Sequence, residues 1–488
     1  MNIIVSGFHY ESHFPILQRI LVELNIKKCH LTYDKTTGRI QLPPAIEAVF
    51  YEHSQISVKL EYSVDWNKLI PLDEDLISKM YPCESIILRM IDRLPTPEGL
   101  YRSYDTRKKM YLKHLRYWNH ILEEDKIDCV IFDIIPHVVY DYIIYELCKL
   151  KNIPVVVVLQ SIVDDCTFYF DGFDDFNSEL KRRYQELLES MKNIPENDIQ
   201  LDRRTKAYLD LQIKNQDPVP WYTQDFFDRP ISKITYFTRF KSILRTVMNG
   251  ITHNEPFIFI EKMLAIIRRG KYAKHLLNYY DNLAKKPDLS NKFVYIPLHM
   301  QPECSTSPMA QAYVDQLLMI QMIAHYLPND VMLYVKEHPG QFDYGRSFSY
   351  YQDLLQIPRV TLIPKRYSSF DLIRNCIAVV TATGTAGFEA LFREKPVLMF
   401  GTNFYESARG VYRIRTNEDC KSAIEEIFEK NKKPMRKDAI IFLKALEETS
   451  INGYIGSAYA RISHLTPEDN VQNVAKAIID KLRSLKSN

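Results

Sequence analysis

The sequence predicts an α/β protein with two doubly wound, Rossmann-like domains that face a cleft, and with a helical insertion between them. Three observations lead to this fold class. Short apolar runs alternate with helical patterns near the N-terminus, the same alternation resumes after residue 289, and the chain between is helix-like and charged. Strands separated by helices pair in parallel, because a parallel connection needs a long crossover.

The composition is that of an ordinary globular protein. The chain has 488 residues with 63 Lys and Arg against 61 Asp and Glu, a net charge of +2, so no overall field attracts nucleic acid. The eight cysteines include no pair at C-x-x-C spacing, and we expect them to stay reduced. Because no basic leader or apolar run of about 18 residues occurs, we expect a cytoplasmic protein without a membrane span.

The first domain opens with a strand, a glycine turn and a helix, and a strand–helix–strand unit follows. Gly7 supplies the turn, and the valine run from Val155 is typical of a buried parallel strand. The expected strands are 2–5, 129–132 and 155–159, and the expected helices are 14–24 and 138–150.

The second domain repeats this alternation. Pro328 ends one of its helices, and Thr466 with Pro467 marks the start of a last helix, because Thr caps helices and Pro suits the first helical position. The expected strands are 293–297, 331–335, 360–363, 378–381 and 397–400, and the expected helices are 309–327 and 386–392.

These elements divide the chain into four predicted parts. They are an N-terminal α/β domain (1–165), a helical insertion or bridge (166–288), a C-terminal α/β domain (289–465) and a C-terminal helix (466–488).

Two loops of the second domain are candidate phosphate sites, because ligands bind at the carboxyl ends of parallel strands. In the loop 336–340, Lys336 and His338 can neutralise or hydrogen-bond a phosphate, and Pro339 holds the turn. A strand-end loop with incidental charges is the alternative for this segment.

The second loop is 381–389, which follows a strand and opens a helix. Thr383, Gly384 and Thr385 provide hydroxyls and free backbone N–H groups for an anion, although Thr383 could simply cap the helix. Glu389, one turn inside the helix, suits a ribose diol or a base amine. Together the two loops indicate a nucleotide-linked substrate.

A third candidate follows the first strand of this domain, where His299, Gln301 and Glu303 are expected to face the cleft; a linker turn is the alternative.

The first domain offers candidates for general acid–base chemistry. Asp133 follows a strand and His137 lies four residues later, so either could be a general base; Asp133 could instead cap the next helix. The loop after the first strand adds His9, Glu11 and His13. No trio has dependable metal-ligand spacing, so no metal is expected.

The motifs K-E-H-P and T-G-T-A-G-F-E-A-L-F-R-E-K-P-V-L-M-F-G-T-N-F-Y resemble the capsule polysaccharide synthesis family, which includes Kdo transferases and related enzymes that use CMP-activated ulosonic acids. The resemblance covers roughly residues 290–415, with a weaker similarity at 133–137. His338-Pro339 also resembles the CMP-binding His-Pro pair of GT-B sialyltransferases, and Gln301-Pro302 resembles the Gln-Pro pair of Kdo transferases.

This resemblance implies a GT-B type glycosyltransferase with the nucleotide sugar in residues 289–465. His338 would bind the CMP phosphate with Lys336 beside it. Thr383 and Thr385 would contact the same phosphate, and Glu389 would contact the cytidine.

The acceptor would belong to the domain 1–165, where Asp133 or His137 would take the proton of an acceptor hydroxyl. The CMP-sugar is the donor substrate, and neither a cofactor nor a metal is implied. The expected partners are this donor and a glycan or lipid-linked glycan acceptor.

Two alternatives stay open. One is a UDP-sugar glycosyltransferase or epimerase of GT-B fold, because several epimerases share this architecture. The other is a non-catalytic partner in capsule assembly or export. Preference for UDP over CMP would distinguish the first alternative from a CMP-sugar transferase. A folded protein that does not turn over the donor would indicate the second.

The segment 233–274 is strongly basic. It holds nine Lys and Arg against two Glu, with apolar residues at helical spacing. A basic amphipathic helix can lie on an anionic membrane surface, so we expect weak, salt-sensitive association with the inner membrane. The alternative is an apolar stripe that packs on the protein while the charges are solvated.

Overall fold

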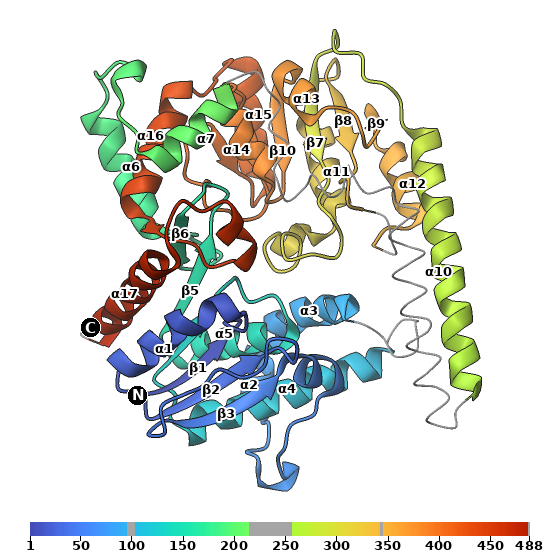
Figure 1. Cartoon of the computed structure of the whole chain (residues 1–488). Coiled ribbons are helices and arrows are strands. Elements are labelled where there is room, and N and C mark those ends of the chain that lie inside the picture. The colour runs from blue at the N-terminus through green and yellow to red at the C-terminus, as the bar shows by residue number, and fades with distance from the viewer. Residues whose placement is uncertain (95–102, 214–255, 342–344, 487–488) are drawn as a thin grey trace. The chain divides into compact units, whose positions relative to one another are not determined.

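The structure is a computed structural model of the chain, and it describes residues 1–94, 103–213, 256–341 and 345–486 (Figure 1). These residues form two compact units. Of the described residues, the first comprises 1–94, 103–210 and 437–486, and the second comprises 211–213, 256–341 and 345–436.

The first unit is built on a seven-stranded sheet with the order β13-β6-β5-β4-β1-β2-β3. Strands β1 to β5 pair in parallel, whereas β6 runs antiparallel to both β5 and β13. The chain order along the sheet reverses between β1 and β4, which makes their carboxyl ends the topological switch point. The strands are β1 (Asn2–Ser6), β2 (Lys28–Tyr33), β3 (Glu47–Glu52), β4 (Cys129–Phe132), β5 (Val155–Gln160), β6 (Cys166–Phe170) and β13 (Ile451–Asn452).

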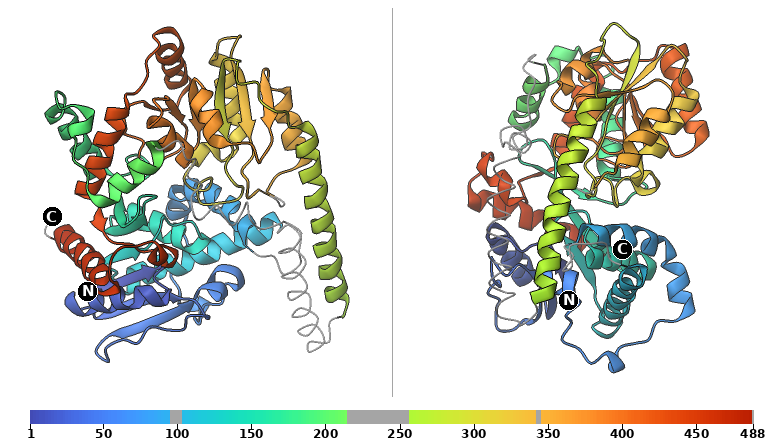
Figure 2. Two further views of the ribbon diagram at one scale, coloured as in Figure 1. Left: turned by 45° about the horizontal axis from the view of Figure 1, so that its top comes forward. Right: turned by 90° about the vertical axis from the view of Figure 1, so that its right-hand side faces the viewer.

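Helices cover both faces of this sheet. Right-handed crossovers place α1, between β1 and β2, and α5, between β4 and β5, on opposite faces, because the two connections run in opposite directions along the sheet. α17 packs beside α1 in one core with Ile3 and Ile131 (Figure 2). The helices are α1 (Phe14–Glu23), α2 (Glu74–Lys79), α3 (Tyr81–Met90), α4 (Tyr104–Glu124), α5 (Val139–Lys151), α6 (Ser178–Ser190), α7 (Arg203–Ile213), α16 (Arg436–Thr449) and α17 (Pro467–Lys486).

The C-terminal residues belong to the first unit, which corrects the expected boundaries. Residues 437–488 lie in this unit because β13 pairs with β6 and α17 packs on α1, whereas the sequence placed residues up to 465 in the second domain. The segment 166–288, expected to be a helical insertion, begins with strand β6 and then contributes α6 to the first unit. The sequence of β6 is short and aromatic, and its apolar residues show no periodicity that would distinguish a strand from a helix.

The second unit has a six-stranded, all-parallel sheet with the order β12-β11-β10-β7-β8-β9. In chain order this is 6-5-4-1-2-3, the doubly wound arrangement, and the switch point lies between β7 and β10. The strands are β7 (Phe293–Pro297), β8 (Met332–Lys336), β9 (Val360–Ile363), β10 (Ala378–Thr381), β11 (Val397–Met399) and β12 (Val411–Arg413).

The helices of the second unit flank this sheet. One core joins α11 and α15 to one sheet face, while α13 and α14 contact β7 and β10. The expected helix 309–327 is shorter, because the Asp315 carboxylate accepts the Leu317 N–H at 3.1 Å and starts α11 there. The helices are α10 (Pro256–Leu283), α11 (Gln316–Tyr326), α12 (Phe348–Gln356), α13 (Ser369–Asn375), α14 (Thr385–Leu391) and α15 (Asn417–Ile424).

The two doubly wound units confirm the predicted α/β class. Every strand expected from the sequence is present within one residue of its predicted bounds, and α17 begins at Pro467 as expected. Strands β2, β3, β6, β12 and β13 were not predicted, because they are short or mix polar with apolar residues and lack the β-branched runs of the central strands.

The basic segment 233–274 is described only in part. Residues 233–255 lie outside the described residues, and so do the side chains of Lys262 and Arg269. On the rest of α10, Ala273 and Leu276 are buried while Lys271 and Lys274 are exposed. Leu264 and Ile267 of the same helix are exposed, and the apolar residues 237–247 on which the prediction rests lie outside the described residues.

Candidate functional site

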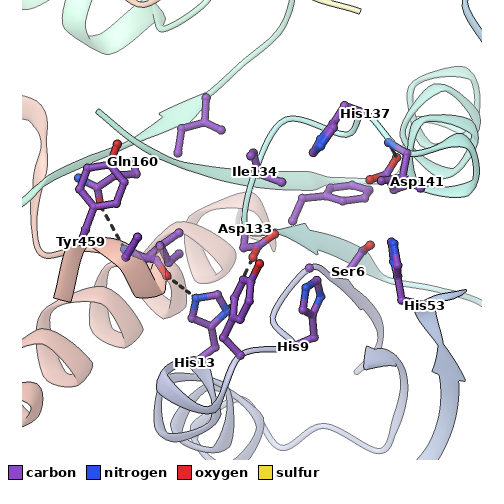
Figure 3. Close-up of a pocket in the computed structure, with 18 of the residues that line it drawn as sticks. Ser6, His9, His13, His53, Asp133, Ile134, His137, Asp141, Gln160 and Tyr459 are labelled. Atoms are coloured by element: carbon purple, nitrogen blue, oxygen red, sulfur yellow. Dashed lines mark hydrogen bonds and ion pairs between the residues drawn. The ribbon is translucent and has the colours of Figure 1, made fainter. Parts of the chain in front are cut away.

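The first unit has a cavity of about 560 Å³ at the switch point between β1 and β4 (Figure 3). Its wall comes from the loop after β1, the loop after β4, the end of β5, His53 and residues 455–459. Asp133 and His137, the two residues predicted for proton transfer, both line it. The cavity lies where a doubly wound sheet is expected to bind its ligand.

Asp133 is a buried carboxyl in this wall. Its side chain is 9% exposed, and burial raises its pKa to about 7. Oδ1 has no hydrogen-bond partner, and Oδ2 lies 3.7 Å from Nδ1 of His13. A carboxyl with this pKa is partly ionised near neutral pH and can take a proton from a hydroxyl.

Gly7 makes room for this carboxyl. Its φ is +98°, and a Cβ at this position would lie 1.7 Å from Oδ1 of Asp133. The glycine predicted as a turn residue therefore also admits the candidate base.

His137 is near the candidate base but engaged with the main chain. Its Nδ1 lies 2.8 Å from the Ile135 carbonyl, and burial lowers its pKa to about 4. Asp141 accepts the Val138 N–H at 2.8 Å at the start of α5. Asp141, not Asp133, thus satisfies this helix end, which removes the alternative that Asp133 is a cap.

The cavity includes residues that the sequence did not indicate. Ile455, Gly456 and Tyr459 line it, and they reach this unit through the pairing of β13 with β6. The Ile455 carbonyl contacts Nε2 of His13. No local pattern in residues 451–461 points to this role, because it depends on strand pairing between segments almost 300 residues apart.

His299 in the second unit corrects its predicted role. It is 7% exposed and does not present its ring to a ligand; its Nε2 accepts the N–H groups of Ala382 and Thr383 at 3.2 Å each. Burial lowers the pKa of His299 to about 3, which keeps this nitrogen unprotonated. His299 therefore holds the loop after β10 against the loop after β7, at the switch point of this unit.

Gln301 and Glu303 lie in the same β7 loop. Gln301 donates its main-chain N–H to Oε1 of Gln341 at 2.6 Å and its Nε2 to the Val314 carbonyl at 3.2 Å. The Glu303 carboxylate accepts the Ser305 hydroxyl at 2.6 Å. Burial lowers the pKa of His338, and the Glu303 charge opposes this shift. These two side chains shape the loop, and Glu303 belongs to the surroundings of His338.

Lys336 and His338 lie at the carboxyl end of β8 with defined geometry. The Lys336 ammonium donates to the Tyr367 carbonyl at 2.9 Å and to Oγ of Ser369 at 2.5 Å, and burial lowers its pKa to about 8. Two of its three hydrogens are thus used. Nδ1 of His338 accepts the Gly340 N–H at 3.0 Å, so the neutral ring carries its hydrogen on Nε2. Pro339 lies within the turn between these two residues.

Glu337 organises this loop and was not predicted as a site residue. It is fully buried, and although burial alone would raise its pKa, Arg346 lowers it. Its carboxylate accepts from Nε of Arg346 at 3.0 Å and from the His338 N–H at 2.8 Å. Arg346 also donates to the His299 carbonyl at 2.9 Å, which links the β7 and β8 loops.

The loop after β10 differs in part from its prediction. The Thr383 hydroxyl donates to the Ser305 carbonyl at 2.8 Å, so its hydrogen is not available to a phosphate. Gly384 directly precedes α14, and its N–H donates to the Thr381 hydroxyl at 2.9 Å. Thr385 opens the helix and is partly exposed. Thr383 therefore neither caps the helix nor offers the donor that we expected.

Glu389 is a buried carboxyl on α14. It is 9% exposed, and burial raises its pKa to about 7 against the opposing effects of Arg393 and Lys336. A carboxyl near Lys336 fits the expected contact with a ribose or a base amine. A carboxyl that is partly protonated can both accept and donate hydrogen bonds.

The described residues contain no group of three His, Cys, Asp or Glu side chains arranged to hold a metal ion. Within the same residues, no helix is long and apolar enough to cross a bilayer.

Solved structures of several sugar-active enzymes resemble this chain at low similarity. KpsC of Thermosulfurimonas dismutans, a beta Kdo 2,7 transferase, has a TM-score of 0.32 at 11% identity over 80% of this chain and 95% of its own. The UDP-GlcNAc 2-epimerase of Methanocaldococcus jannaschii has a TM-score of 0.27 at 13% identity over 92% and 99%. A glycosyltransferase from Rickettsia africae has a TM-score of 0.26 at 10% identity over 100% and 99%.

Comparison with protein families and with curated proteins gives the family of this chain. No curated protein matches the chain. The family described as capsule polysaccharide biosynthesis protein matches residues 176–454, which include the loops of Lys336, His338 and Glu389. Because this match spans more than half of the 488 residues, the protein belongs to the capsule polysaccharide biosynthesis family.

Proposed function

We propose that the protein is a metal-independent glycosyltransferase that moves an ulosonic acid, Kdo or a nonulosonic acid, from its CMP-activated donor to a surface-glycan acceptor. The observation that carries this proposal is Asp133, a buried carboxyl with a pKa of about 7 in the wall of a 560 Å³ cavity. Family membership supports a sugar polymer as the context of the reaction.

The transfer exchanges one bond for another. The acceptor oxygen bonds to the anomeric carbon, the bond from that carbon to the CMP phosphate oxygen breaks, and CMP leaves with the electron pair. The carboxylate of Asp133 takes the proton of the acceptor hydroxyl. This role requires the ionised form, which is half populated at a pH of about 7.

Groups in the second unit suit the departing phosphate. The third hydrogen of the Lys336 ammonium and Nε2–H of His338 are donors at the carboxyl end of β8, and donors of this kind stabilise charge that develops in a transition state. Glu389 would accept from a ribose hydroxyl or the cytosine amine. Lys336, His338 and Glu389 would thus bind the donor, whereas Asp133 or His137 would act on the acceptor hydroxyl.

Nucleotide preference tests the donor class. We expect CMP to raise the thermal unfolding temperature of the purified protein more than UDP, CDP or GDP at equal concentration. Release of CMP from a CMP-ulosonate in the presence of a capsule oligosaccharide then tests transfer. A shift with UDP alone would contradict the CMP proposal, and nucleotide binding without any donor turnover would contradict catalysis.

We also propose a cytoplasmic location with weak association at the inner membrane surface. The support is the basic segment 233–274, with its nine basic and two acidic residues.

A further inference from the structure

The cavity of the first unit contains an unusual balance of hydrogen-bonding groups. Among the described residues that line it are four histidines, Asp133 and Asp141, and none is Lys or Arg. No fixed positive charge therefore lines the described part of this wall, and Arg93, which is not a lining residue, donates to the His137 carbonyl. The protonation of the histidines decides which donors and acceptors remain.

The tautomer of His13 is set by a main-chain carbonyl. Its Nε2 contacts the Ile455 oxygen, which can only accept, so Nε2 carries the hydrogen and Nδ1 keeps its lone pair. Burial lowers the pKa of His13 to about 4, which keeps the ring neutral at neutral pH. Nδ1 has no hydrogen-bond partner and faces Oδ2 of Asp133 at 3.7 Å (Figure 3).

The tautomer of His137 follows in the same way. Its Nδ1 lies 2.8 Å from the Ile135 carbonyl and must donate to it, so the neutral ring keeps a lone pair on Nε2. His13 and His137, the two histidines whose tautomers are defined, thus each keep one ring nitrogen that can accept a hydrogen bond.

Three buried atoms in this wall lack a partner. They are Nδ1 of His9, Nδ1 of His13 and Oδ1 of Asp133. Buried polar atoms without partners cost free energy, so a ligand that supplies hydrogens to Nδ1 of His13 and to Oδ1 of the Asp133 carboxylate binds favourably. A sugar ring carries several hydroxyl donors at adjacent carbons, whereas a carboxylate or phosphate brings further acceptors and a charge.

We infer that this cavity binds a neutral, hydroxyl-rich sugar. The sugar unit of the acceptor that receives the transferred group is therefore not an acidic sugar. This inference rests on the proposed function, because it assigns the cavity to the acceptor. One hydroxyl would donate to Asp133 and be the nucleophile, and a neighbouring hydroxyl would donate to His13. The two acceptors at 3.7 Å suit such a pair of donors.

Matched glycosides test this inference by direct binding without a donor. The probes are methyl β-glucoside against methyl β-glucuronide and methyl β-galactoside against methyl β-galacturonide, which differ only in the group at C6. We expect saturation-transfer NMR titrations at pH 7.5 to show each neutral glycoside binding about tenfold or more tightly than its uronide.

Two variants of the cavity make the test specific. His13→Phe removes an acceptor and should lower affinity for both neutral glycosides about tenfold, whereas His325→Phe on the exposed face of α11 should leave it unchanged. Tyr10→Arg adds a cation at a lining residue that is 43% exposed, and should raise uronide affinity toward that of the neutral sugar.

The results separate this inference from the donor proposal. Uronides that bind the wild-type protein as tightly as neutral glycosides, unchanged neutral binding in His13→Phe, or no glycoside binding at all would each overturn the inference. A CMP titration of the same samples reports on the second unit, and a thermal unfolding transition like that of the wild-type protein checks that each variant is folded. If the wild-type protein does not bind CMP, that result contradicts the donor proposal and leaves the inference about the cavity unaffected.

Discussion

In the proposed function, Asp133 is the base that takes the proton of the acceptor hydroxyl. Replacing it by Asn keeps its size but removes the base, so we expect transfer to fall about 100-fold or more while CMP binding persists. In the wild-type protein kcat/KM should rise as pH increases through about 7, because burial raises this pKa and only the carboxylate accepts a proton. A pH–rate profile measures this. Weaker CMP binding in Asp133→Asn would instead make the residue structural.

Gly7 offers a second test of the same carboxyl. Gly7→Ala adds a Cβ that would lie 1.7 Å from Oδ1 of Asp133, and it also strains a φ of +98°, so we expect loss of transfer and a stability cost of about 1–2 kcal/mol. Gly38→Ala is the matched control, since its φ is +77° but no atom lies within 4 Å of the added Cβ. If both variants lose transfer equally, the effect comes from backbone strain.

His338 tests the phosphate site. We expect His338→Ala to remain folded and to lose about 100–1000-fold in transfer rate, because one donor to the developing oxyanion is lost. His325→Ala on α11 serves as the control. Near-wild-type turnover of His338→Ala would remove this residue from the mechanism, whatever its effect on CMP affinity.

At the scale of elements, the start of α17 holds the C-terminal wall of the cavity. Asn470 is 3% exposed; its Oδ1 accepts the Tyr454 N–H at 2.7 Å, and its Nδ2 donates to the Tyr454 carbonyl at 3.1 Å. These bonds position the chain that leads to Ile455.

We therefore expect Asn470→Ala to destabilise the protein by about 1–3 kcal/mol, because it leaves two buried main-chain groups unpaired. Neutral glycoside binding should weaken while the response to CMP persists. Asn473→Ala, which loses an exposed bond to the Asn452 carbonyl, is the control for a substitution on the same helix. Chemical denaturation and NMR titration measure the two effects, and unchanged glycoside binding would contradict the positioning role.

At the scale of the whole molecule, each unit has its own switch point with its own polar groups. Asp133 and His13 lie at the switch point of the first unit, whereas Lys336 and His338 of the second unit lie at the end of β8, the strand next to β7. Under the proposed function, donor and acceptor bind to different compact units, and we expect variants of one site to leave binding at the other unchanged.

The proposed membrane association also concerns the whole molecule. Leu264 and Ile267 of α10 are exposed beside Arg268 and Lys271, which suits contact with an anionic surface. We expect flotation with anionic liposomes at low salt and release at high salt, since each basic residue near the surface contributes about 1 kcal/mol.

Charge reversal checks this association. Arg268→Glu combined with Lys271→Glu should reduce flotation, whereas Lys181→Glu with Arg182→Glu on α6, also exposed, should not. Absence of binding at low salt would exclude the membrane proposal.

The sequence by itself determined the two α/β repeats and the loops that carry Asp133, Lys336 and His338. Strand and helix periods are local, and ligands bind where parallel strands end, so a strand followed by polar residues already indicates a site. Only the tertiary structure decided which of these side chains are available. His299 and Thr383 look like ligand groups in sequence, yet their hydrogen bonds hold the β10 loop. Likewise Ile455 reaches His13 only through pairing of β13 with β6, because contacts between distant segments leave no local pattern.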